Sequence, residues 1–207
     1  MKLYKLTNQD DTTFKGTKWG KGVTHKATGK DEHLCSSGFI HAYRDPHQAV
    51  FMNPIHGNFQ NPHIWECEGD VVIDDTTKVG CKSMTTIKRT RLPRMTTMQR
   101  VEIAIHLALI VYKEKDFKTW ADNWLSGKDR SRTAAEAAAD AAEAAAARTA
   151  KAAAAWAAAW AATKAADAAV AKAAAGAAAE AAWAAAGAAW AGHNMVPVIN
   201  SVMGKQK

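Results

Sequence analysis

The fold of this chain is decided by residues 134–191, AAEAAADAAEAAAARTAKAAAAWAAAWAATKAADAAVAKAAAGAAAEAAWAAAGAAWA, which we call the alanine tract. About 40 of its 58 residues are alanine, the residue with the highest intrinsic helix propensity. This bias predicts helix along the tract from propensity alone. We expect the tract to fold back at least once, although no strong breaker between Ala134 and Ala175 fixes where. A single unbroken helix is the alternative.

Charged and aromatic side chains divide the surface of this predicted helix. Thr133 and Glu136 form a plausible start, because a threonine three residues before a glutamate can satisfy free backbone N–H groups. One side of the helix carries Glu136, Asp140, Glu143 and Lys151. Trp156 and Trp160 fall on the opposite side, which predicts a small-residue face that packs closely against another helix. The candidate partner-binding residues are the tryptophans Trp156, Trp160, Trp183 and Trp190. Packing of the tract on its own domain is the alternative.

Two further helices are predicted immediately before the tract. Thr96 or Thr97 can cap a helix whose apolar residues recur at helical spacing, at Val101, Ile105, Leu109 and Tyr112. Residues 117–127 fit a short helix that ends at Gly127 and carries Phe117, Trp120 and Trp124 on one face. We therefore predict an all-helical, alanine-rich region over residues 94–207.

The first 93 residues have a different pattern. Residues 2–6 alternate like a short strand, and residues 33–43 indicate a turn followed by a strand. Asp45 and Pro46 are start signals for a helix over residues 47–52. Residues 64–73 and 85–92 predict two more strands, and Pro93 ends the unit. The prediction is an α+β protein, with a small mixed α/β domain over residues 1–93 followed by the helical region.

The charge of the chain is compatible with several classes of partner. Its formal net charge is +7, which permits contact with nucleic acid or with an acidic protein surface. The densest basic group is Lys88, Arg89, Arg91 and Arg94. Nucleic-acid binding through this group is one hypothesis, and a solvated linker is the alternative.

The cysteines and the hydropathy indicate a soluble protein of a reducing cytoplasm. Three cysteines without close pairing predict neither a disulfide framework nor a zinc ribbon. The start of the chain lacks a hydrophobic signal core. Alanine is scarcely hydrophobic on insertion scales, so we expect no membrane partner.

No motif in the sequence fixes a reaction. The eight histidines match no common zinc spacing. A phosphate-binding glycine loop and a serine nucleophile elbow are both missing from the sequence. We therefore expect no metal and no cofactor.

One group of residues nevertheless resembles a family of enzymes. The strand Gly38-Phe39-Ile40-His41, the short helix after it and a later strand with acidic residues resemble small bacterial proteins thought to share the ADP-ribosyltransferase type of fold. The resemblance implies an NAD cleft in which His41 orients the ribose and Glu66 or Glu68 steadies the developing positive charge. It also implies cofactor contacts from Tyr4, Phe39 and Tyr43. The alternative is that these residues only stabilise the strands on which they lie.

A second resemblance covers nearly the whole chain. It is to uncharacterised tailed-phage proteins, and its motifs are LCSSGFIHAY at residues 34–43, NPIH at 53–56, WECEG at 65–69 and WADNWLSGKDRS at 120–131, before an Ala/Trp-rich tail. The tail is also similar to helical regions of some proposed immunity proteins. This resemblance implies that the protein is of phage origin and acts in an infected cell, and it leaves the mechanism open.

These observations lead to two functional hypotheses. The first is a phage accessory protein in the cytoplasm of the infected bacterial host, where it binds and modulates a host protein, with an anti-defence role as one form of that activity. The second is an NAD-binding or NAD-consuming enzyme of the ADP-ribosyltransferase type. A homo-oligomer is compatible with both.

Overall fold

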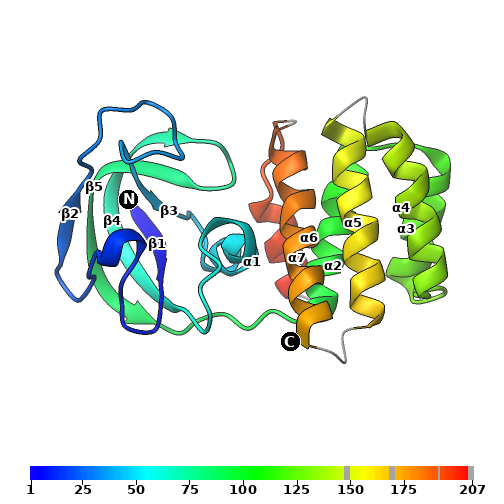
Figure 1. The fold of residues 1–207 in the computed structure, drawn as a ribbon, viewed down its shortest axis with the longest axis horizontal. Helices are drawn as coiled ribbons and strands as arrows, with labels where there is room; N and C mark the ends of the chain where they lie inside the picture. The colour runs from blue at the N-terminus through cyan, green and yellow to red at the C-terminus, as the bar shows by residue number, and fades with distance from the viewer. Residues whose placement is uncertain (147–149, 168–170, 191, 205–207) are drawn as a thin grey trace. The chain divides into compact units, whose positions relative to one another are not determined.

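The computed structural model divides the chain into two compact units, Met1–Arg94 and Met95–Lys207. It describes residues 1–146, 150–167, 171–190 and 192–204, while the side chains of 144–146, 150–152, 171–172, 174 and 190 lie outside this description. The first unit is an antiparallel sheet with a small helix, and the second is built from helices (Figure 1). The expected α+β layout is therefore confirmed.

The sheet of the first unit closes on itself. Its strand order is β1 (Lys2–Thr7), β4 (His63–Asp74), β5 (Val79–Thr90) and β2 (Thr24–Lys26), and neighbouring strands are antiparallel. The short β3 (Ile40–Ala42) also pairs with β5. Tyr43, directly after β3, exchanges two backbone hydrogen bonds of 2.8 Å with Tyr4 of β1. Strands β1, β4, β5 and β3 thus form a closed circuit of pairing.

The closed circuit surrounds a small apolar core. Alternate residues of the strands point to the same face, and the buried residues on the inner face are Leu3, Trp19, Ala42, Trp65, Cys67, Val79, Cys81 and Met84. Cys67 is a free, buried thiol, and burial raises its pKa to about 12. This cysteine is therefore protonated at neutral pH and acts as a packing residue.

A single α-helix packs against β1 in this unit, α1 (Pro46–His56). The Asp45 carboxylate accepts hydrogen bonds from the backbone N–H groups of His47 and Gln48, and Pro46 occupies the first turn. The predicted start is therefore confirmed. The helix runs four residues beyond the predicted end at Met52 and includes Pro54.

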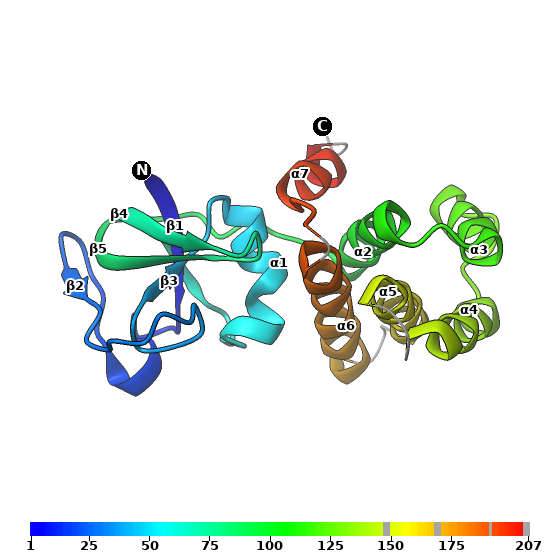
Figure 2. The same cartoon turned by 90° about the horizontal axis from the view of Figure 1, so that it is seen from above.

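The second unit is helical throughout its described part (Figure 2). Its elements are α2 (Thr97–Val111), α3 (Lys115–Ser126), α4 (Arg132–Ala146), α5 (Ala150–Ala166), α6 (Ala171–Trp190) and α7 (Val196–Gly204). Thr96 and Gln99 form a reciprocal capping box at the start of α2, and Gly127 ends α3 in the left-handed conformation with φ 78°. Both predicted helix boundaries are confirmed. Among the described residues, no helix is long and apolar enough to cross a membrane.

The described part of the alanine tract forms α4, α5 and α6, so the tract folds back and the single-helix alternative is wrong. Two details of the prediction also change. The first helix begins after Ser131, whose hydroxyl accepts from the backbone N–H of Ala134, so Thr133 lies within the helix. Glu136, Asp140 and Glu143 belong to α4, whereas Lys151 and the two tryptophans belong to α5, so the predicted charged and tryptophan sides are not opposite faces of one helix.

Small residues let α5 and α6 approach closely. A Cβ atom at Gly187 of α6 would lie 3.1 Å from the Cβ of Ala154 and 3.4 Å from its backbone nitrogen. Contacts this short leave no room for a side chain. Trp156 and Trp160 of α5 pack edge to face, with ring centroids 6.5 Å apart. The close approach of the two backbones and the contact between the tryptophan rings together supply the packing that large aliphatic side chains provide in other helices.

Candidate functional site

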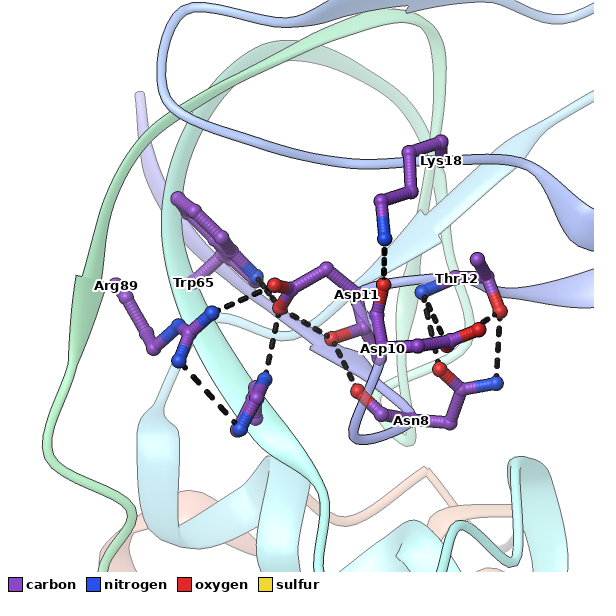
Figure 3. Close-up of polar contacts among 9 residues, drawn as sticks. Asn8, Asp10, Asp11, Thr12, Lys18, Trp65 and Arg89 are labelled. Atoms are coloured by element: carbon purple, nitrogen blue, oxygen red, sulfur yellow. Dashed lines mark hydrogen bonds and ion pairs between the residues drawn. The ribbon is translucent and has the colours of Figure 1, made fainter.

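The loop after β1 is held by the carboxylate of Asp11 (Figure 3). Its Oδ1 accepts a hydrogen bond from Nδ1 of His63 at 2.8 Å and another from Nε1 of Trp65 at 3.0 Å. Its Oδ2 accepts a hydrogen bond from Nη2 of Arg89 at 2.6 Å. These partners come from β4 and β5, so one side chain joins the loop to two strands. We call Asp11, His63, Trp65 and Arg89 the Asp11 cluster.

The Asp11 cluster keeps a charged carboxylate at the protein surface. Burial alone would raise the pKa of Asp11, but the hydrogen bonds from His63 and Trp65 and the charge of Arg89 outweigh it and lower the pKa. The guanidinium carbon of Arg89 lies 5.5 Å from the ring centroid of Trp65. Its Nη1 lies 3.5 Å from Nε2 of His63. Arg89, with a side chain 49% exposed, is thus fixed in one orientation while still in contact with solvent.

The rest of the loop is also tied down by hydrogen bonds, several of which are drawn in Figure 3. The side-chain oxygens of Asn8 and Asp10 both accept from the backbone N–H of Thr12, at 3.0 and 3.1 Å. Lys18 donates to the backbone oxygen of Asp10. The backbone N–H of Trp19 donates to the oxygen of Asp11 at 2.8 Å. The two ends of the loop are therefore fastened to each other.

This fastened loop presents Phe14 to solvent. The indole Nε1 of Trp19 donates to the hydroxyl of Thr13 at 2.9 Å, next to Phe14. Lys15 and Gly16 then adopt left-handed conformations, with φ 56° and 71°. Phe14 is 80% exposed. A phenylalanine is normally buried, so its display on an ordered turn is a distinct surface feature.

A second polar cluster is buried between α1 and the start of β5. The hydroxyl of Tyr43 lies 3.1 Å from Nδ1 of His56, and Nε2 of His56 lies 3.4 Å from Nζ of Lys78. Lys78 is also 3.6 Å from the Asp75 carboxylate. Burial, reinforced by the charge of Lys78, lowers the pKa of His56 to about 4. Burial raises the pKa of Tyr43. His56 and Tyr43 are thus both neutral at pH 7.

The residues proposed for catalysis lie on different strands. His41 is on β3, where its Nε2 contacts the backbone oxygen of Leu34; burial lowers its pKa. Glu66 is on β4 and forms an ion pair of 3.0 Å with Lys2, and Glu68 is an exposed residue of the same strand. Within the part of the chain that the structure describes, no hydrogen bond or ion pair joins His41 to either glutamate.

The residues proposed to contact a cofactor are partly brought together. The backbone of Tyr4 pairs with Glu66 on one side and with Tyr43 on the other. Phe39 lies elsewhere, with its ring centroid 4.0 Å from the Nζ of Lys82. Throughout the described ranges, no group of three His, Cys, Asp or Glu side chains is placed to hold a metal ion.

Lys5 is a buried amine that the sequence analysis missed. Its Nζ donates to the backbone oxygen of His41 at 2.9 Å and lies 4.7 Å from the ring centroid of Trp19. Burial lowers the pKa of Lys5 to about 8. The alternation of β1 contained the signal, because Lys5 is two residues after Leu3 and so faces the same core.

The tryptophans proposed for partner binding differ in exposure. Trp156 and Trp160 are half-buried, and their indole N–H groups are shielded from solvent without a hydrogen-bond partner in the described structure. Trp183 of α6 is 50% exposed. The side chain of Trp190 lies outside the described residues.

Comparison with known proteins identifies only a domain without an assigned role. Residues 1–98 match the profile of a domain of unknown function (DUF7666). No curated protein matches the chain, and no solved structure does. The match covers the whole sheet unit and the Asp11 cluster, and it extends into the first turn of α2.

Proposed function

We propose that the protein is a phage accessory factor that binds and modulates a host protein in the cytoplasm of the infected bacterium, and that its helical unit supplies the binding surface. The observation that carries the proposal is the exposure of Trp183. It is the one residue between Ala181 and Ala189 of α6 that is exposed, at 50%, and all the others in this described stretch are buried.

An exposed tryptophan on a firmly packed helix suits a protein partner. An indole buries ~150–250 Å² when it is covered, and tryptophan is enriched among the residues that dominate interface energies. The neighbours of Trp183 are locked into the helical packing, so little ordering is needed when a partner covers it. We infer a host protein with an apolar pocket that accepts an indole. The similarity to tailed-phage proteins supports the infected-cell setting, with a defence component as one candidate.

The test compares two exposed aromatic residues on different units. Host proteins are isolated from lysate with each of three full-length chains: wild type, Trp183→Ala and Phe14→Ala. A host protein that is retained is then purified and titrated against each of the three chains. We expect Trp183→Ala to weaken binding at least ~10-fold, which corresponds to ~1.4 kcal/mol, and Phe14→Ala to bind like wild type. Equal affinity for all three chains, or no retained host protein, overturns the proposal.

The second candidate function is NAD binding by the first unit. The observation in its favour is that Tyr43, a proposed cofactor contact, follows His41 on the β3 segment and meets Tyr4 of β1. Calorimetric titration of NAD into wild type and His41→Ala separates the two functions. Saturable binding to wild type that is lost in His41→Ala supports the NAD site. The absence of any heat of binding at about millimolar NAD, a concentration far above the Kd of an ordinary cofactor site, rejects it.

A further inference from the structure

Two basic segments that are far apart in the sequence lie along neighbouring stretches of β5. Residues 12–30, the basic loop, contain five lysines and no acidic residue. Residues 88–94, the basic run, contain four basic residues and no acidic one. The backbone N–H of Gly22, next to Lys21, donates to the oxygen of Thr86 at 2.7 Å, two residues before the basic run. The contact between Arg89 and Asp11 joins the basic run to the residue directly before the basic loop.

The lysines of the basic loop face solvent. All five are exposed: Lys15, Lys18, Lys21, Lys26 and Lys30. The Asp10 carboxylate keeps its charge when it accepts from Thr12, and Asp11 is paired with Arg89. Asp31 and Glu32 follow the basic loop directly and are exposed. The nine basic residues of the two segments outnumber these four acids, so the net charge of this surface is positive and attracts a polyanion.

Two features of this surface match the phosphate and the base of a nucleotide. Arg89 is held over Trp65 and against Asp11, which orients its guanidinium without consuming all five of its N–H donors, so it is prepared to bind a phosphate. Phe14 offers an exposed aromatic ring on which a base can stack. We propose that the basic loop, with Phe14 and Arg89, is a binding surface for single-stranded nucleic acid.

The chemistry favours a single strand over other polyanions. In a duplex the bases are already stacked and paired, so Phe14 finds no free base face. A simple anionic polymer such as polyglutamate supplies charge but lacks planar rings, and an acidic protein offers stacking rings only at its occasional aromatic residues, whereas every nucleotide of a single strand carries both a charge and a ring. Base stacking on an aromatic residue contributes ~1–3 kcal/mol per base in proteins that bind single strands. This surface lies on the first unit and does not depend on the host-protein site proposed on α6.

The test measures fluorescence anisotropy of labelled oligothymidine, oligouridine and a matched duplex with the full-length protein. We expect the single strands to bind more tightly than the duplex, and Phe14→Ala to lose ~10-fold or more in affinity for them. Val72→Ala is the matched control, because Val72 is 59% exposed at the far half of β4, and it should bind like wild type. Tighter binding of either oligothymidine or oligouridine than of the duplex supports the proposal.

Salt dependence and competition provide the second readout. The double variant Lys15→Gln/Lys21→Gln should reduce the slope of log K against log salt by roughly 0.7 for each phosphate that a lysine no longer neutralises. Polyglutamate should compete weakly. No binding at low salt, equal binding of the duplex or polyglutamate, or unchanged affinity in Phe14→Ala overturns the proposal. Trp183→Ala should bind the strands like wild type, so failure here is distinguishable from failure of the host-protein proposal.

Discussion

Nδ1 of His63 lies 2.8 Å from Oδ1 of Asp11, although 52 residues separate them in the sequence. Because a carboxylate only accepts hydrogen bonds, this nitrogen carries a proton. The contact fixes Asp11, directly before the basic loop, against β4, and the bond from Arg89 fixes it against β5. The display of Phe14 therefore depends on a network that lies outside the turn that carries it.

Removal of the Asp11 carboxylate should loosen the loop. In Asp11→Ala, His63, Trp65 and Arg89 lose their shared acceptor, and we expect the free energy of local opening to fall by ~2–3 kcal/mol. Hydrogen–deuterium exchange in peptides covering residues 8–19, including the Trp19 amide, should accelerate at least ~10-fold. Asp122→Ala removes an ion pair with Lys118 in which both side chains are more than half exposed, so it should leave this exchange unchanged.

The buried His56 should make the first unit less stable in mild acid. Its pKa is about 4 in the fold and ~6.5 when unfolded, so the unfolded chain binds more protons between these values. The free energy of unfolding therefore falls as the pH falls from ~6.5 to ~4, by up to ~3 kcal/mol. Urea unfolding followed by NMR signals of the first unit should show this loss, and His56→Gln should flatten it. An equal slope in His56→Gln would assign the loss to other groups.

Two glycines of α6 should respond differently to a large side chain. In Gly187→Leu the new side chain meets the backbone of Ala154, and we expect the helical unit to lose ~1–3 kcal/mol of stability or more. In Gly176→Leu the nearest atom is Cδ of Lys164, which belongs to a flexible side chain that can move. This matched variant should lose less and recovers some helix propensity. Thermal unfolding followed by circular dichroism compares them, and similar losses would contradict the close α5 and α6 packing.

The parts of the fold that local signals control were predictable. Asp45 with Pro46, Thr96 with Gln99, and Gly127 each act within one helical turn, and the structure has helix boundaries at all three. The strand β5 begins six residues before the prediction, at Val79, because residues 79–81 pair with β4 on one side and with β3 on the other. Pairing between strands depends on distant residues, so the short segment carries no local sign of it.

The polar clusters could not be predicted from spacing. Asp11 meets Arg89 across 78 residues, and Tyr43 meets His56 only because α1 turns back over the sheet. Such contacts follow from strand register, which a single sequence does not fix. The proposed trio of His41, Glu66 and Glu68 relied on the order of elements, and strand pairing places His41 opposite Gly80 but Glu66 opposite Tyr4.

Photo-crosslinking from position 183 inside host cells shows directly whether this position of α6 contacts a host protein. A photoreactive phenylalanine analogue replaces Trp183 in one chain and the exposed Lys118 of α3 in a control chain, and adducts are identified after irradiation. We expect one discrete adduct with a host protein from position 183 that is absent from position 118. The same adducts from both positions, or none from position 183, would contradict it.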